Sequence, residues 1–148
     1  MPIQAFFEGI IAALGALILE LSPAIFGVTL AETSLFFILF TASVEEIMKY
    51  VFIYNHYLKM KAGEKILLSA IFIGLGFAIV DVSTKYLYFE KNTALPIAGI
   101  LLVHFSTTAL LGLFFWKKNQ KTLCIGIPFI VLNILLHFLY NFLVLRYF

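Results

Sequence analysis

Residues 66–88, ILLSAIFIGLGFAIVDVSTKYLY, decide the fold, because so long an apolar stretch contains a single acidic residue, Asp81. A helix needs roughly 20 apolar residues to cross the hydrocarbon core of a bilayer, and this segment meets that length. Inside lipid, each segment must satisfy its own backbone hydrogen bonds. The stretch is therefore expected to be a transmembrane helix.

Four further apolar stretches, residues 3–21, 34–58, 96–116 and 123–147, are separated from it by short polar segments. The 148-residue chain is 63% hydrophobic and only 12% charged, whereas a soluble domain has about 25% charged residues. Most of its surface must therefore face lipid, and no stretch remains for a soluble domain or a nucleic-acid-binding face. We predict an all-α integral membrane protein: one domain, residues 1–148, forming a bundle of about five transmembrane helices around a polar site. Ser22 and Pro23 are expected to end the first helix.

The basic residues indicate an orientation. The connections after the second and fourth spans lie on the same side of the membrane. They carry six of the ten Lys and Arg residues: Lys59, Lys61, Lys65, Lys117, Lys118 and Lys121. The positive-inside rule places this side in the cytoplasm, with the N-terminus inside and the C-terminus outside. The cell membrane is the natural default.

Several polar side chains lie in the middle of predicted spans, where a charge costs at least a few kcal/mol and usually faces the bundle interior. Measured from the cytoplasmic lysines at about 1.5 Å per residue, Glu46 and His104 lie at about 20 Å. Asp81 and His137 lie at about 24 Å by the same rise. Four helices thus place acids and imidazoles in one layer, which predicts a site.

Spacing within the helices adds detail. Glu45 and Lys49 are four residues apart, so they share a face and are expected to pair. Glu46 points away from Glu45 and is expected to be free to reach a metal or a water. His137 and Asn141 also share a face.

Three other acidic residues, Glu8, Glu20 and Glu32, lie near the ends of predicted spans. Side chains at these positions can reach water, so we expect them to be solvated. The single cysteine, Cys124, cannot form an internal disulfide and is given no catalytic role.

The chemistry open to acids and histidines in a membrane is limited. Carboxylate and imidazole suit zinc or a similar divalent ion, with Glu46, His104 and His137 as the expected ligands and Asp81 as a further candidate. Alternatively, a glutamate acts directly as general base on a water, and His137 or Asn141 donates to the developing oxyanion. Either mechanism activates water where lipid excludes it, which fits hydrolysis of a peptide bond in or beside the membrane. The HExxH motif of ordinary zinc proteases is absent.

Four short blocks then point to a family. Residues 45–49 (EEIMK) resemble the EExxK motif of the PrsW family of intramembrane proteases, and residues 74–81 (GLGFAIVD) are similar to its GxGFAxxE helix. Residues 104–112 (HFSTTALLG) look like its HxxxTxxxG segment, and residues 137–141 (HFLYN) match its HxxxN block. The blocks occur in the family's order on successive predicted helices. The family belongs to a larger group with the CAAX prenyl proteases and the bacteriocin-immunity-type membrane proteases.

The resemblance implies an endopeptidase that cleaves membrane-associated protein substrates. It implies that Glu45 and Glu46 activate water or bind the metal and that His104 is their partner. His137 with Asn141 would complete the ligand shell or bind the oxyanion. Asp81 stands where the family has a glutamate, so its reach is one methylene shorter.

Two other classes of protein remain open. The same superfamily includes a γ-secretase subunit thought to have lost its protease function, so a non-catalytic membrane scaffold is one alternative. A proton- or cation-coupled transporter is the other, because buried acids and histidines can relay protons. Transporters usually show inverted repeats and interrupted helices, and the sequence shows neither. The oligomeric state is open.

Overall fold

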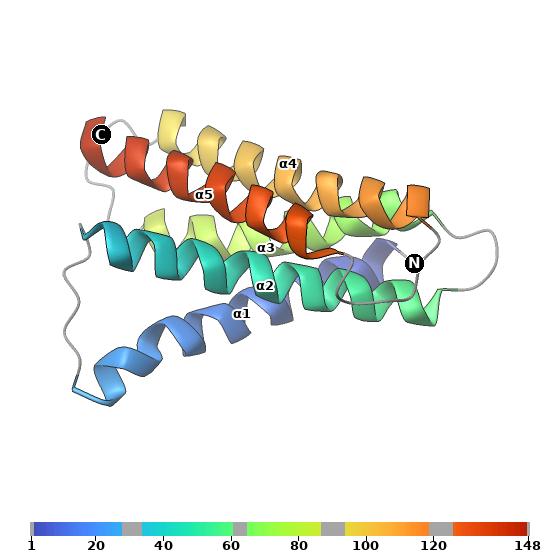
Figure 1. Cartoon of the computed structure of the whole chain (residues 1–148), viewed down its shortest axis with the longest axis horizontal. Coiled ribbons are helices and arrows are strands. Elements are labelled where there is room, and N and C mark those ends of the chain that lie inside the picture. Colours follow the sequence, from blue (N-terminus) through green and yellow to red (C-terminus); the bar gives the residue numbers. More distant parts are fainter. Residues whose placement is uncertain (1, 28–33, 61–64, 87–93, 119–125, 148) are drawn as a thin grey trace.

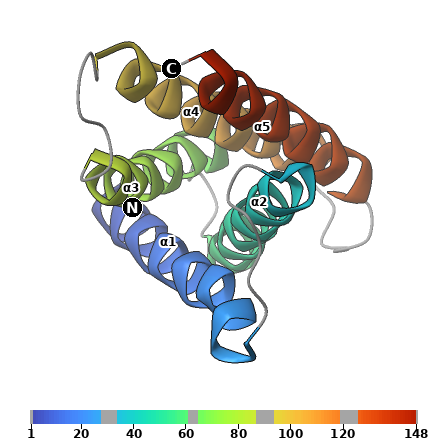
Figure 2. The same ribbon diagram turned by 90° about the vertical axis from the view of Figure 1, so that its left-hand side faces the viewer.

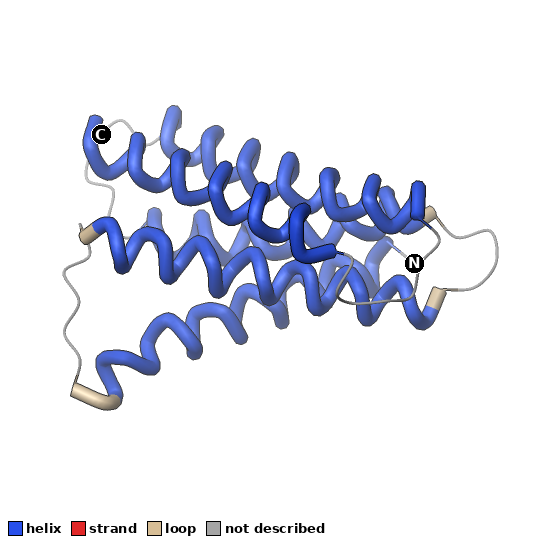
Figure 3. The backbone as a smooth tube through the Cα atoms, viewed as in Figure 1, coloured by secondary structure: helices blue, strands red, loops and turns tan. Residues whose placement is uncertain are grey.

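The computed structural model describes residues 2–27, 34–60, 65–86, 94–118 and 126–147, and within these ranges every long element is a helix (Figure 3). The helices are α1 (Pro2–Ile25), α2 (Leu35–Lys59), α3 (Ile66–Tyr86), α4 (Ala94–Lys118) and α5 (Ile127–Tyr147) (Figure 1). The predicted all-α bundle is confirmed. Residues 87–88 and 123–125, which were assigned to spans, lie outside the described residues.

Four of the helices, α1, α3, α4 and α5, are long and apolar enough to cross a membrane. Helix α2 is as long, with 25 residues, but carries Glu45, Glu46 and Lys49 near its middle. All three of these side chains are buried, whereas large apolar side chains such as Phe36 and Leu102 are exposed on the outside of the bundle. The chain is therefore a membrane protein that encloses its most charged helix segment.

The predicted start of the second span at Ser34 agrees with the structure, and the predicted end of the first span does not. Ser34 begins α2, and its Oγ accepts a hydrogen bond from the Phe37 amide at 3.1 Å. The expectation that α1 ends at Ser22 and Pro23 was wrong, because the helix continues through Pro23 to Ile25. Proline lacks the N–H that would bond the carbonyl four residues earlier. The Ser22 hydroxyl donates to that carbonyl, Leu19 O, at 2.6 Å, so the helix can continue.

Helix α3 lies between α1 and α4, and α2 lies between α1 and α5 (Figure 2). Glycines set the close approach of α3 to its neighbours. A Cβ at Gly9 of α1 would clash with the Ile73 carbonyl, and one at Gly74 would clash with the Thr108 side chain of α4. A Cβ at Gly76 would meet backbone atoms of α1. Small residues of this kind let membrane helices pack backbone to backbone, and this packing fixes Asp81 on α3 relative to the other helices.

Candidate functional site

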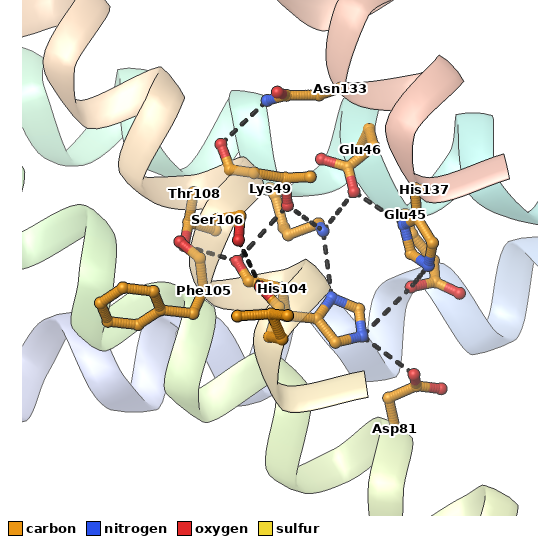
Figure 4. A network of polar contacts seen from close by, with 12 residues as sticks. Glu45, Glu46, Lys49, Asp81, His104, Phe105, Ser106, Thr108, Asn133 and His137 are labelled. Carbon is orange, nitrogen blue, oxygen red and sulfur yellow. Dashed lines mark hydrogen bonds and ion pairs between the residues drawn. The ribbon is translucent and has the colours of Figure 1, made fainter. Parts of the chain in front are cut away.

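Lys49 lies at the centre of a polar network built by α2, α3, α4 and α5, as Figure 4 shows. Its side chain is fully buried. The ammonium forms an ion pair with Glu46 Oε1 and lies 3.1 Å from His104 Nδ1 and 3.0 Å from Thr107 Oγ1. A lysine has three N–H donors and no acceptor, so these partners use all three. A buried charge is tolerated when it is paired and hydrogen-bonded in this way.

These contacts fix the tautomer of His104. Because Lys49 can only donate, His104 Nδ1 must be the acceptor, and the ring proton of a neutral imidazole then lies on Nε2. His104 Nε2 is 2.9 Å from Asp81 Oδ2 and donates to it. Asp81 also accepts a hydrogen bond from Lys85 Nζ at 2.9 Å. His104 is thus held at both nitrogens, as an Nε2–H donor.

His137 has the opposite arrangement. Its Nδ1 lies 2.7 Å from Glu46 Oε1, and a carboxylate only accepts, so Nδ1 carries the proton. The lone pair of His137 Nε2 is therefore free, and this buried atom has no hydrogen-bond partner among the described residues. Glu46 accepts from both His137 and Lys49. This shared role explains why Lys49 pairs with Glu46, so the expected pairing of Lys49 with Glu45 was wrong.

Glu45 is an acid of the site that has an unpaired carboxylate oxygen among the described residues. Its side chain is buried, and Oε2 has no hydrogen-bond partner within the part of the chain that the structure describes. This oxygen lies 3.7 Å from His137 Nε2 and 3.8 Å from His104 Nε2. The sequence pattern suggested that Glu46 would be the acid free to reach a metal or water. In the structure Glu45 is that acid, and Glu46 positions Lys49 and His137.

The donor atoms of Glu45, His104 and His137 can be compared with the ligand geometry of a zinc site. One donor atom each from Glu45, His104 and His137 lies within 4.8 Å of the other two. Two histidines and one glutamate form a known catalytic zinc set, whose ligand atoms lie about 3.4 Å apart in a tetrahedral site. Glu45 and His137 fit, because both offer a free lone pair and a carboxylate supports the far nitrogen of His137. His104 does not fit while Lys49 holds its proton on Nε2.

The fifth predicted site residue, Asn141, is half-buried on α5, whereas Asn133 is completely buried. Asn133 Nδ2 donates to the Thr107 carbonyl at 2.9 Å, and this bond ties α5 to α4 beside the lysine. Sequence reasoning missed Asn133. Both asparagines are four residues from His137, so the spacing that pointed to Asn141 applied equally to Asn133.

Two of the three acids expected to be solvated are only partly exposed. Glu8 Oε2 lies 2.6 Å from Nδ1 of the buried His56, a second polar contact that the sequence did not reveal. Glu20 is half-buried and lines a small cleft beside Glu45. The expectation failed for Glu8 and Glu20 because α1 turns these residues toward α2 and α3. Glu32 and Cys124 lie outside the described residues.

Comparisons with known proteins found no match that would indicate a function. No protein-family model, no curated protein and no solved structure matches this chain. The resemblance to the PrsW family therefore remains an expectation drawn from four short motifs, and the case for a function depends on the geometry that four helices create.

Proposed function

We propose that the chain is an intramembrane endopeptidase in which Glu45 accepts a proton from the attacking water. One observation carries this proposal: Glu45 Oε2 and His137 Nε2 are buried acceptors 3.7 Å apart, and neither has a hydrogen-bond partner among the described residues. An unsatisfied buried acceptor costs about 1–3 kcal/mol. One water at ordinary hydrogen-bond distance can donate to both atoms.

The chemistry follows from where these groups lie. A water that donates both protons keeps an oxygen lone pair for attack on a peptide carbonyl. Glu45 takes one proton as the new C–O bond forms, and His137 orients the water. Glu45 then returns this proton to the amide nitrogen as the C–N bond breaks, leaving a carboxylic acid and an amine. The Nε2–H of His104 donates to Asp81 in this structure and would have to turn from that carboxylate to bind the developing oxyanion.

Further support comes from the surroundings of the site. Glu45 and His137 lie in a bundle of which four helices are long and apolar enough to span a membrane, which favours membrane-associated proteins as substrates. The four motifs that resemble PrsW-like proteases contain Glu45, His104 and His137. The distribution of lysines favours an orientation with the N-terminus in the cytoplasm.

A zinc-dependent version of the same reaction is the second candidate. The spacing of Glu45, His104 and His137 favours it. A bound divalent ion would polarise the carbonyl and help a water to ionise near neutral pH. This version requires Lys49 to release His104 Nδ1, so that the ring proton can move from Nε2 and free that atom as a ligand.

The test is cleavage of a panel of single-span membrane proteins by the purified protein in liposomes. Replacing Glu45 by Gln keeps its size and removes the base, and a general base contributes about 10²–10⁴-fold. We therefore expect Glu45→Gln to lower kcat/KM at least about 100-fold, with helix content unchanged by circular dichroism. Glu8→Gln is the matched control, since Glu8 bonds His56 away from the site.

Metal analysis separates the two versions. Full activity in a strong chelator, without stoichiometric zinc, supports Glu45 acting alone, whereas loss of activity that zinc restores supports the metal-dependent version. If no substrate in a broad panel is cut, or if Glu45→Gln cuts as fast as the parent protein, the peptidase proposal is wrong. Proton flux measured in the same liposomes would then separate a transporter from a scaffold.

A further inference from the structure

A small, partly open cleft connects the proposed base with the side of the bundle. It lies between α1, α2 and α3, and its lining includes Ala13, Ala16, Leu17, Glu20, Glu45 and Asp81. Glu45 is buried, and its unpartnered Oε2 lies 3.7 Å from His137 Nε2 on the inner side of the cleft. The proposed catalytic acid therefore forms the inner wall of the cleft.

The path of α1 opens this side of the bundle. Near its N-terminus α1 is held against α3 by the close approach at Gly9 and Gly76. Toward its C-terminus α1 diverges from α2 and α3, as two perpendicular views show (Figures 1 and 2). On α1 the cleft wall begins with the small side chains of Ala13 and Ala16. Ala13 and Ala16 pack against Phe77 here, so a peptide would reach Glu45 from the lipid side by moving α1 further from the rest of the bundle.

The charge of the cleft indicates what it accepts. Its ionisable lining residues are three acids, Glu20, Glu45 and Asp81, and the nearby ammonium of Lys85 compensates one of their charges. Asp81 is already hydrogen-bonded to Lys85 and His104. Glu20 Oε1 is buried without a hydrogen-bond partner in the described part of the chain. A carboxylate in such a place forms strong, charge-assisted hydrogen bonds with an ammonium or a guanidinium group.

We propose that this cleft is the substrate entrance and that Glu20 selects substrates with a lysine or arginine side chain close to the scissile bond. The inference rests on the proposed peptidase function. Glu20 and Glu45 line the same small cleft. A cation at Glu20 and a peptide bond at Glu45 would therefore belong to neighbouring residues of one substrate.

The first test compares two single-span substrates that differ only in one residue beside the cleaved bond, Lys or Gln. We expect kcat/KM to favour the Lys substrate about tenfold, the ratio for a difference of about 1.4 kcal/mol. Glu20→Gln should bring this ratio close to one, and Glu20→Lys should favour a substrate with Glu at that position. Glu8→Gln, an acid of the same helix outside the cleft, should keep the parent ratio. An unchanged ratio in Glu20→Gln would overturn the selection.

The second test does not depend on cleavage. A photo-crosslinking amino acid replaces Leu17 in the His137→Ala protein, and capture of the Lys and Gln peptides is compared in liposomes. We expect several-fold stronger capture of the Lys peptide, lost when Glu20→Gln is added. Such capture without cleavage by the parent protein would support the cleft and refute the peptidase. Cleavage by the parent protein without selective capture would support the peptidase and refute the cleft.

Discussion

Replacing Lys49 by Met is the sharpest test of the buried network. Methionine is similar in length but has neither the charge nor the three N–H donors. The substitution leaves Glu46, His104 Nδ1 and Thr107 Oγ1 without the partner that they share. All three residues are completely buried, so water cannot replace the lysine without opening the bundle.

The magnitude follows from this burial. Removing one member of a buried ion pair costs about 3–5 kcal/mol, because the other charge remains uncompensated. We therefore expect Lys49→Met to lower the free energy of unfolding by about 3–5 kcal/mol. Removing both charges is often close to neutral. The double variant Glu46→Gln, Lys49→Met should then be more stable than Lys49→Met alone.

The assay is reversible unfolding in mixed micelles, followed by circular dichroism for both single variants and the double variant. Lys85→Met is the control, because Lys85 pairs with Asp81 but has a side chain that is 35% exposed. Asp81 is buried but keeps its hydrogen bond from His104, so we expect Lys85→Met to cost less than Lys49→Met. Nitrogen NMR of labelled histidine gives a second readout, since Nδ1 of His104 should be unprotonated in the parent protein and should lose this fixed state in Lys49→Met.

Two results would refute the reasoning. Lys49→Met could destabilise the protein no more than Lys85→Met, which would mean that the lysine is not a buried, paired charge. The double variant could also be less stable than either single variant. The charge of Glu46 would then not be destabilising in the absence of Lys49, and the two residues would contribute to stability independently.

Two further substitutions test the packing around the site by the same unfolding assay. Gly9→Leu should cost at least about 1–3 kcal/mol, because overpacked positions force helices apart and a Cβ at Gly9 meets the Ile73 carbonyl; unchanged stability would show that α1 and α3 do not approach closely. Asn133→Leu should cost about 0.5–1.5 kcal/mol, the net value of one hydrogen bond, because the Thr107 carbonyl loses the bond from Asn133 but keeps its bond within α4; a cost no larger than that of the half-buried Asn141→Leu would contradict this role.

Much of the fold could be predicted because lipid imposes simple rules. Helix length and apolarity located five helices, and the helical rise placed Glu46, Asp81, His104 and His137 in one layer. Pro23 was misjudged because a proline usually ends a helix, and the sequence does not show that the Ser22 hydroxyl can bond the carbonyl that Pro23 leaves free.

The partners within the site were harder to predict. Both Glu45 and Glu46 can reach Lys49 along α2, and the choice is made by His137 on α5, which holds Glu46 in place. The contact between Glu8 and His56 joins residues that are 48 positions apart, and no local pattern links them. Contacts of this kind depend on how helices are packed and rotated, which periodicity alone does not define.

The position of Lys49 also has a consequence for how the protein is made. Its bond to His104 joins residues 55 positions apart, and the bond of Glu46 to His137 joins residues 91 positions apart. Inserting a lysine at the centre of an isolated helix costs about 2.5–3.5 kcal/mol. Glu46 on the same helix compensates the charge of Lys49, but during synthesis α2 emerges before the helices whose histidines complete the hydrogen bonds of this ion pair. Stable insertion of α2 must therefore wait for α4 and α5, so the bundle enters the membrane as a cooperative unit and a chain cut after α3 should fail to integrate α2.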